Sequence, residues 1–191
     1  MKVCIFASSS SRISSTYADA AKELGVLLAR SGTEVVFGGG GIGLMGILAD
    51  TILKNDGIIT GVIPSFMKDQ GWNHSSVNKM IVTDDMGERK KRMFSLAEAI
   101  IALPGGVGTL EELTEAITLK QLGLFRGPII ILNTRNFYNS LLEFFEHMVS
   151  ESFLRNEHKA IWEVVSTPLE VMMLLERRDP WLFDPIKIAK I

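Results

Sequence analysis

The sequence has one cysteine, no long hydrophobic run and almost no net charge, and each scarcity excludes a class of protein. Cys4 has no second cysteine to pair with, so an intrachain disulfide is excluded and a reducing compartment is favoured. No apolar run approaches the roughly 20 residues of a membrane span, and the N-terminal run is too short for a signal peptide. A net charge of −2 offers no broad basic surface for nucleic acid. We therefore expect a cytoplasmic protein that binds neither nucleic acid nor membrane.

Histidine is also scarce. His74, His147 and His158 are scattered along the chain, without the spacing of zinc ligands, so we expect no metal site.

Short apolar runs alternate with longer helical patterns along the 191 residues. We expect strands at 3–7, 34–37, 58–63, 79–83, 100–103, 128–132 and 161–165, and helices at 17–29, 44–53, 86–97, 110–122, 140–149 and 167–176. Ser14 or Ser15 is expected to cap the first helix and Thr167 the last. This pattern predicts an α/β fold: a Rossmann-like, doubly wound parallel sheet with helices on both faces, in a single nucleotide-binding domain over 1–191. The apolar tail after Arg178, with Trp181, Leu182 and Phe183, is expected to pack on the body or on a partner chain.

Ligands of such sheets bind beyond the carboxyl ends of the strands, so the loops that follow strands are the candidate sites. The first glycine loop, Gly38–Gly46, contains G-x-G-x-x-G and includes Gly40 and Gly41. A dinucleotide site also expects an acidic residue about 20 positions later to hold the ribose hydroxyls. The next strand ends in Val62-Ile63-Pro64-Ser65 and offers no acid, which disfavours NAD.

The second glycine loop, Pro104–Thr109, lies between a buried strand and a helix. Glycines allow a ligand close to the backbone, and the helix start offers unpaired amides that favour phosphate. No Gly-Lys-Ser/Thr follows, so the loop is not a Walker A motif and hydrolysis of nucleoside triphosphates is disfavoured. The serine loop, Ser8–Ser15, is rich in hydroxyls for capping or for binding phosphate or ribose. A purely structural turn is the alternative for each glycine loop, and helix capping alone is the alternative for the serine loop.

Charged residues flank the second glycine loop. Glu111 and Glu112 lie in a predicted helix start, where carboxylates are favoured, and their side chains diverge by about 100°. Glu112 shares a helix face with Thr109, so both can reach one ligand. Arg89 lies near another helix start, where a cation is unfavourable without an anionic partner. A solvated surface position is the alternative for Arg89.

Two segments carry a resemblance to a known family. Met86-Gly87-Glu88-Arg89-Lys90, followed by Pro104-Gly105-Gly106-Val107-Gly108-Thr109-Leu110-Glu111-Glu112, resembles the M-x-x-R-K and P-G-G-x-G-T-x-x-E motifs of the LOG ("lonely guy") family of cytokinin riboside 5′-monophosphate phosphoribohydrolases. The resemblance covers most of the chain. It departs at Gly87, where the family often has histidine, and at Gly71, where it often has glutamate ahead of the match to His74.

The resemblance implies a Rossmann-like homodimer that hydrolyses the N-glycosidic bond of AMP-type nucleotides without metal or cofactor. It implies that Arg89 and Glu112 are catalytic. It further implies substrate contacts at Lys90, Gly106, Val107, Gly108, Thr109, Leu110, Glu111 and Thr118. From the loops and motifs described above we add Ser9, Gly40, Gly41, Met86 and Gly105 as candidate substrate-binding residues. Members are often labelled lysine decarboxylases, but the sequence shows no constellation for a pyridoxal phosphate Schiff base. A nucleotide-binding or molybdenum-cofactor-binding carrier or sensor remains the alternative function.

Overall fold

The computed structural model describes residues 1–177, and the predicted packing of the tail after Arg178 lies outside them. The strands are β1 (Lys2–Phe6), β2 (Glu34–Phe37), β3 (Ile59–Pro64), β4 (Lys79–Thr83), β5 (Ala99–Ala102), β6 (Ile129–Leu132) and β7 (Glu163–Val165). The helices are α1 (Ser15–Arg30), α2 (Gly43–Lys54), α3 (Ser65–Asp69), α4 (Met86–Leu96), α5 (Val107–Gln121), α6 (Asn139–Ser150) and α7 (Pro168–Arg177), with 3-10 turns η1 (Thr134–Asn136) and η2 (Asn156–Ile161).

The strands form one parallel sheet in the order β4-β3-β2-β1-β5-β6-β7, which confirms the predicted Rossmann-like fold. Cys4 in β1 pairs with Val36 of β2 on one side and with Ile100 of β5 on the other. The chain builds outward from β1 to β4 and then returns to β5, beside β1. Ligands of such sheets bind where the strand order reverses, so the carboxyl ends of β1 and β5 mark the candidate site.

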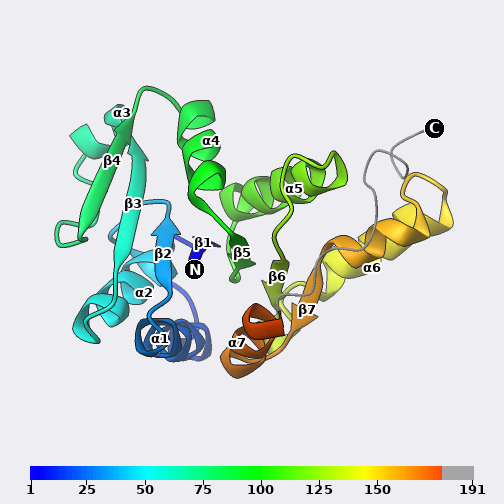
Figure 1. Ribbon diagram of the computed structural model, residues 1–191, viewed down its shortest axis with the longest axis horizontal. Helices are drawn as coiled ribbons and strands as arrows, with labels where there is room; N and C mark the ends of the chain where they lie inside the picture. The colour runs from blue at the N-terminus through cyan, green and yellow to red at the C-terminus, as the bar shows by residue number, and fades with distance from the viewer. Residues whose placement is uncertain (178–191) are drawn as a thin grey trace.

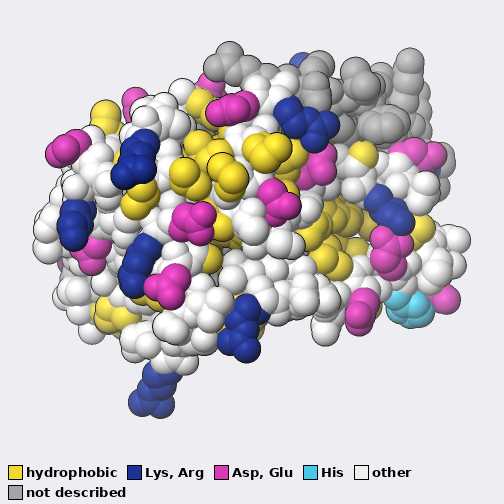
Figure 2. Space-filling model, turned by 90° about the horizontal axis from the view of Figure 1, so that it is seen from below, with side chains coloured by type: hydrophobic (Ala, Val, Ile, Leu, Met, Phe, Trp, Pro, Cys, Tyr) yellow, Lys and Arg dark blue, Asp and Glu magenta, His cyan; other side chains and the backbone are white. Residues whose placement is uncertain are grey.

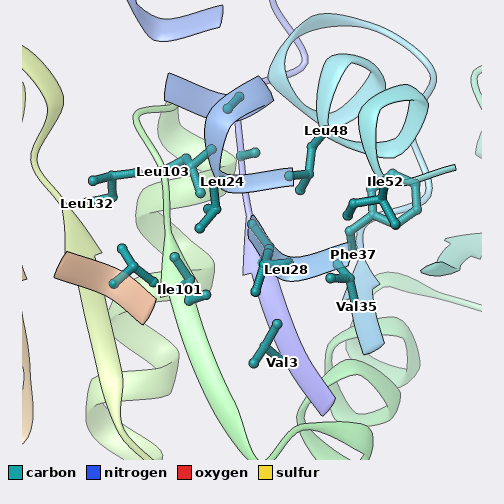
Figure 3. Packing of buried hydrophobic residues seen from close by; sticks show 14 of the residues in the cluster. Val3, Leu24, Leu28, Val35, Phe37, Leu48, Ile52, Ile101, Leu103 and Leu132 are labelled. Carbon is teal, nitrogen blue, oxygen red and sulfur yellow. The ribbon is translucent and has the colours of Figure 1, made fainter. Parts of the chain in front are cut away.

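Alternation along each strand divides the core between the two faces of the sheet. Val3 and Ile5 pack with α1, α2 and α7, whereas Cys4 and Phe6 pack with α4, α5 and α6. The two helical layers lie below and above the sheet in Figure 1. Figure 3 shows Leu24 and Leu28 of α1 packing against residues of the central strands on the first face. Apart from Lys2 and Glu34 at their first positions, the central strands β2, β1 and β5 are apolar because both of their faces are buried.

Several predicted boundaries need correction. Helix α5 begins at Val107 rather than Leu110, because Gly106 is its N-cap and the glycine-containing first turn is already helical. Residues 161–165 are not one strand: Ile161 ends η2, and β7 starts at Glu163. The short elements α3, η1 and η2 were not predicted, since one or two turns carry too little periodicity to recognise.

The two predicted caps differ in detail. Ser14 is the N-cap residue of α1, but its hydroxyl makes no capping bond and instead donates to Thr16 Oγ1. Thr167 caps α7 reciprocally with Glu170: the amide of Glu170 donates to Thr167 Oγ1, and the Glu170 carboxylate accepts from the amide of Thr167.

Charges of both signs are interspersed on the face seen in Figure 2, around apolar side chains near its centre. Among residues 1–177, no helix is both long enough and apolar enough to cross a bilayer.

Candidate active site

The candidate site is built from the loops at the carboxyl ends of β1, β2 and β5, together with the starts of α4 and α5. The amide of Met45 donates to the carbonyl of Ser8 at 3.2 Å, which joins the first glycine loop to the serine loop. Arg89 of α4 links the first glycine loop to α5, as described next. Segments 8–14, 38–46, 86–90 and 104–112 therefore meet at the reversal of strand order, as the sequence predicts.

Arg89 is the centre of this arrangement and is only 6% exposed. Its Nη1 donates to Glu112 Oε1 at 2.8 Å. Its Nε donates to the carbonyl of Val62 at 3.1 Å, and its Nη2 to the carbonyl of Gly38 at 3.3 Å. Three elements thus fix one guanidinium in one orientation, and the anionic partner expected for Arg89 is Glu112.

Gly38 makes this arrangement possible by its lack of a side chain. A Cβ at that position would lie 2.1 Å from Arg89 Nη2 and 3.2 Å from the sulfur of Met45. Any other residue would therefore occupy the space of the guanidinium. The glycine that follows β2 is required for the close approach of Arg89.

Glu112 lies on the buried face of α5 and is 7% exposed. Burial raises the pKa of its carboxyl above the usual 4.5, and the charge and hydrogen bond of Arg89 oppose that rise. The pairing keeps a buried negative charge beside the second glycine loop. Such a group can stabilise a developing positive charge or accept a proton.

Glu111 faces a different cation, as its predicted divergence from Glu112 requires. Lys90 Nζ forms an ion pair with the Glu111 carboxylate and a second one, at 2.6 Å, with Glu115 Oε2. Hydrogen bonds to these two carboxylates raise the pKa of Lys90. Helices α4 and α5 are thus joined by two sets of ion pairs. The Arg89–Glu112 pair is buried, and the set of Lys90 with Glu111 and Glu115 is half-exposed.

The second glycine loop leaves its amides available. Gly106 is the N-cap of α5, no side chain caps this helix, and its first turn holds no acid. The first amides of a helix have no partner within it, so those of Val107, Gly108 and Thr109 suit an anion. Thr109 is 5% exposed and packs against Gly105, where a Cβ would lie 2.1 Å from Thr109 Oγ1.

Some amides of the first glycine loop are used in hydrogen bonds within the protein. The amide of Gly41 donates to the carbonyl of Trp72 at 3.0 Å, and Gly40 forms an isolated bridge with Asn73. The amide of Gly46 donates to the carbonyl of Ile42. Helix α2 starts in this loop at Gly43, also without a side-chain cap or an acid in its first turn, so both glycine loops lead into a helix start that suits an anion.

Of the remaining residues predicted to contact substrate, four are exposed near the loops of the site and one lies away from them. Ser9 is exposed in the serine loop, Met86 is 40% exposed at the start of α4, and Val107 and Leu110 are exposed on the first turn of α5. Thr118 is not brought to the loops: it lies about 14 Å farther along the axis of α5 than Thr109, and its hydroxyl donates to the carbonyl of Thr114.

The structure also places residues here that sequence reasoning missed. Glu115 joins the Lys90 cluster, and its spacing of four from Glu111 was a usable signal because such residues share a helix face. The carbonyls of Gly38 and Val62 that hold Arg89 left no signal, since any residue offers a carbonyl. The sequence departs from the common pattern of the resembled family at Gly71 and Gly87. Gly71 lies in the turn after α3, and Gly87 lies on the exposed first turn of α4.

Comparison with known proteins assigns the family. The profile of a family described as "Possible lysine decarboxylase" matches residues 45–175. The cytokinin riboside 5′-monophosphate phosphoribohydrolase LOG4 of Arabidopsis thaliana is 38% identical over 179 residues, covering 94% of this chain and 83% of the relative. The chain belongs to the LOG family. A probable LOG enzyme of rice, LOGL6, is 37% identical over 94% of this chain and 72% of its own length.

Solved structures similar to this LOG family member support the fold. A molybdenum cofactor binding protein of Rippkaea orientalis superimposes with a TM-score of 0.68 at 24% identity, over 92% of this chain and 94% of its own. The molybdenum cofactor carrier protein of Chlamydomonas reinhardtii gives a TM-score of 0.69 at 17% identity, over 92% and 96%. At these identities the likeness concerns the fold alone.

Proposed function

We propose that this LOG family member is a hydrolase that cleaves the N-glycosidic bond of purine nucleoside 5′-monophosphates of the AMP type, including N6-modified cytokinin nucleotides. Water adds its hydroxyl to C1′ of the ribose and its proton to the leaving base, so the products are free base and ribose 5-phosphate. The observation that carries the proposal is the buried Arg89–Glu112 pair beside a helix start with free amides. The names of its relatives support the same reaction.

The chemistry follows from the charges. Cleavage of a ribosyl C–N bond develops positive charge on the sugar, as glycoside hydrolysis does. The Glu112 carboxylate stabilises that charge or orients the attacking water, and Arg89 holds Glu112 in place. The amides of the second glycine loop and the Thr109 hydroxyl bind the 5′-phosphate. That remote binding energy supports orientation at the reacting carbon.

The decarboxylase description fits this site less well. A Schiff base requires a lysine that readily becomes a neutral amine, which a lowered pKa provides. The lysine of this site, Lys90, has a raised pKa because Glu111 and Glu115 bind its ammonium. A carrier function is also less favoured, since a pure binder does not require a carboxylate such as Glu112 here.

The direct test is to incubate the protein with AMP, N6-isopentenyl-AMP and adenosine and to measure ribose 5-phosphate or free base. We expect the two monophosphates to be far better substrates than adenosine, because adenosine lacks the group that the second glycine loop binds. Equal efficiency with AMP and adenosine would contradict the phosphate assignment. Release of no base from any nucleotide would contradict the proposed reaction.

We also propose that the protein acts as a homodimer in the cytoplasm. Helix α5 and the turn after it leave large apolar side chains exposed, including Val107 at 84% and Leu124 at 73%, and a second copy is a natural cover for them. The single thiol, Cys4, is buried, which suits a reducing compartment. Light scattering at micromolar concentration should give twice the chain mass, and a fully active monomer would refute the dimer.

A further inference from the structure

The residue that leads into the second glycine loop is held by a side chain from another part of the chain. The phenol of Tyr138, the residue just before α6, donates to the carbonyl of Leu103 at 2.6 Å. The amide of Leu103 donates to the carbonyl of Phe6 in β1 at 2.9 Å. Leu103 is therefore fixed at both of its backbone polar groups, directly before Pro104.

This fixation comes where the strand ladder stops. Register pairing between β5 and β6 ends at Ala102 with Ile131, and Pro104 has no amide hydrogen to donate. On the β6 side, therefore, neither strand pairing nor the next residue continues the backbone ladder into the loop. The phenol of Tyr138 thus connects the last residue before the loop to the segment that follows β6.

Tyr138 is itself rigidly placed. Its amide donates to Asn133 Oδ1 at 2.7 Å, and Asn133 Nδ2 donates to Asn139 Oδ1 at 2.9 Å. The amide of Asn133 donates to the carbonyl of Val165 in β7 at 2.7 Å. The ring of Tyr138 is 4% exposed, and burial raises the pKa of its phenol, which therefore stays protonated as a donor.

We propose that Tyr138 is a positioning residue for the second glycine loop. Through the carbonyl of Leu103 it sets where the free amides of Val107, Gly108 and Thr109 stand relative to the Arg89–Glu112 pair. It touches no reacting atom, and its effect falls on the binding of the phosphate rather than on bond cleavage. This inference rests on the proposed function, in which that loop binds the 5′-phosphate.

The test compares Tyr138→Phe with the wild-type protein. Phenylalanine keeps the ring and its packing and removes only the donor, so the Leu103 carbonyl is left buried without a partner. We expect KM for AMP to rise about tenfold with kcat within twofold, and the Kd for ribose 5-phosphate, measured by calorimetry, to rise equally. Asn139→Ala, which removes the partner of Asn133 from an exposed position, should shift KM in the same direction by less.

Tyr17→Phe is the matched control. Tyr17 packs its ring against Phe137, as Tyr138 does, but its hydroxyl makes no hydrogen bond with the described residues. That variant should keep the wild-type KM and Kd.

The outcomes separate the two proposals. A Tyr138→Phe protein with a lowered melting temperature but unchanged KM and Kd would show a merely structural role and overturn the inference, as would a fall in kcat alone. If the wild-type protein binds AMP and ribose 5-phosphate without hydrolysing AMP, the proposed function fails and the Kd comparison still decides the role of Tyr138. If the wild-type protein binds neither compound, both proposals are wrong.

Discussion

Gly38→Ala tests how the site is assembled, because it changes one atom at the tightest contact around Arg89. The new Cβ would lie 2.1 Å from Arg89 Nη2. Non-bonded heavy atoms settle at about 3.5 Å, so the guanidinium or the backbone at position 38 must move by about 1.4 Å. Such a shift breaks the bond from Nη2 to the carbonyl of Gly38 and displaces the partner of Glu112.

The size of the effect follows from that displacement. Overpacking of this kind costs about 1–3 kcal/mol of unfolding free energy, and a misplacement of about 1 Å in a catalytic group costs roughly 10²-fold in rate. Urea unfolding and release of ribose 5-phosphate from AMP measure the two quantities. Gly108→Ala is the control for stability, because a Cβ there meets nothing within 4 Å and alanine favours the helix. A Gly38→Ala protein with wild-type stability and a rate within twofold of wild type would refute this account of Arg89.

Three further predictions concern protons and phosphate. Burial raises the folded-state pKa of Glu112, so the contribution of this carboxyl to the free energy of unfolding is full below pH 4.5 and is lost as pH rises through the folded-state pKa. Urea unfolding at a series of pH values should show this loss of stability in the wild-type protein and not in Glu112→Gln. Burial lowers the pKa of Lys120 from 10.5 to about 8, so wild-type stability should gain from this group as pH rises from about 8 to 10.5, and Lys120→Met should lack that gain in thermal melts. Thr109→Val keeps the shape of the side chain but removes its hydroxyl, so KM for AMP should rise about five- to tenfold in steady-state kinetics while KM for adenosine stays unchanged.

The fold was predictable because its signals are local. Strands β5 and β6 are continuous apolar runs, which parallel strands buried on both faces require. The separation of Glu111 from Glu112 was equally predictable, since helix geometry alone sends adjacent side chains to different partners.

The detailed contacts of the site were not predictable, because they join residues far apart in sequence through groups that every residue has. Arg89 is 27 residues from Val62 and 51 from Gly38, and it binds their backbone carbonyls. The amide of Gly41 likewise donates to the carbonyl of Trp72, 31 residues away, and the segment around Trp72 has no recognisable motif. The start of α5 was missed because glycine in Val107-Gly108-Thr109 disfavours a helix, whereas the turn forms with Gly106 as its N-cap.

Hydrolysis of AMP by Glu112→Gln, beside Glu111→Gln, is the most direct test of the central claim. Glutamine keeps the size of Glu112 and removes its charge, so the rate of ribose 5-phosphate release should fall by roughly 10²–10⁴-fold. The Kd for AMP should change much less, because in the proposed function backbone amides of the second glycine loop, rather than Glu112, bind the phosphate. Glu111→Gln should stay near the wild-type rate, since Glu111 pairs with Lys90 rather than with Arg89. A near wild-type rate for Glu112→Gln, or an equal loss for Glu111→Gln, would contradict the assignment of Glu112 as the catalytic carboxylate.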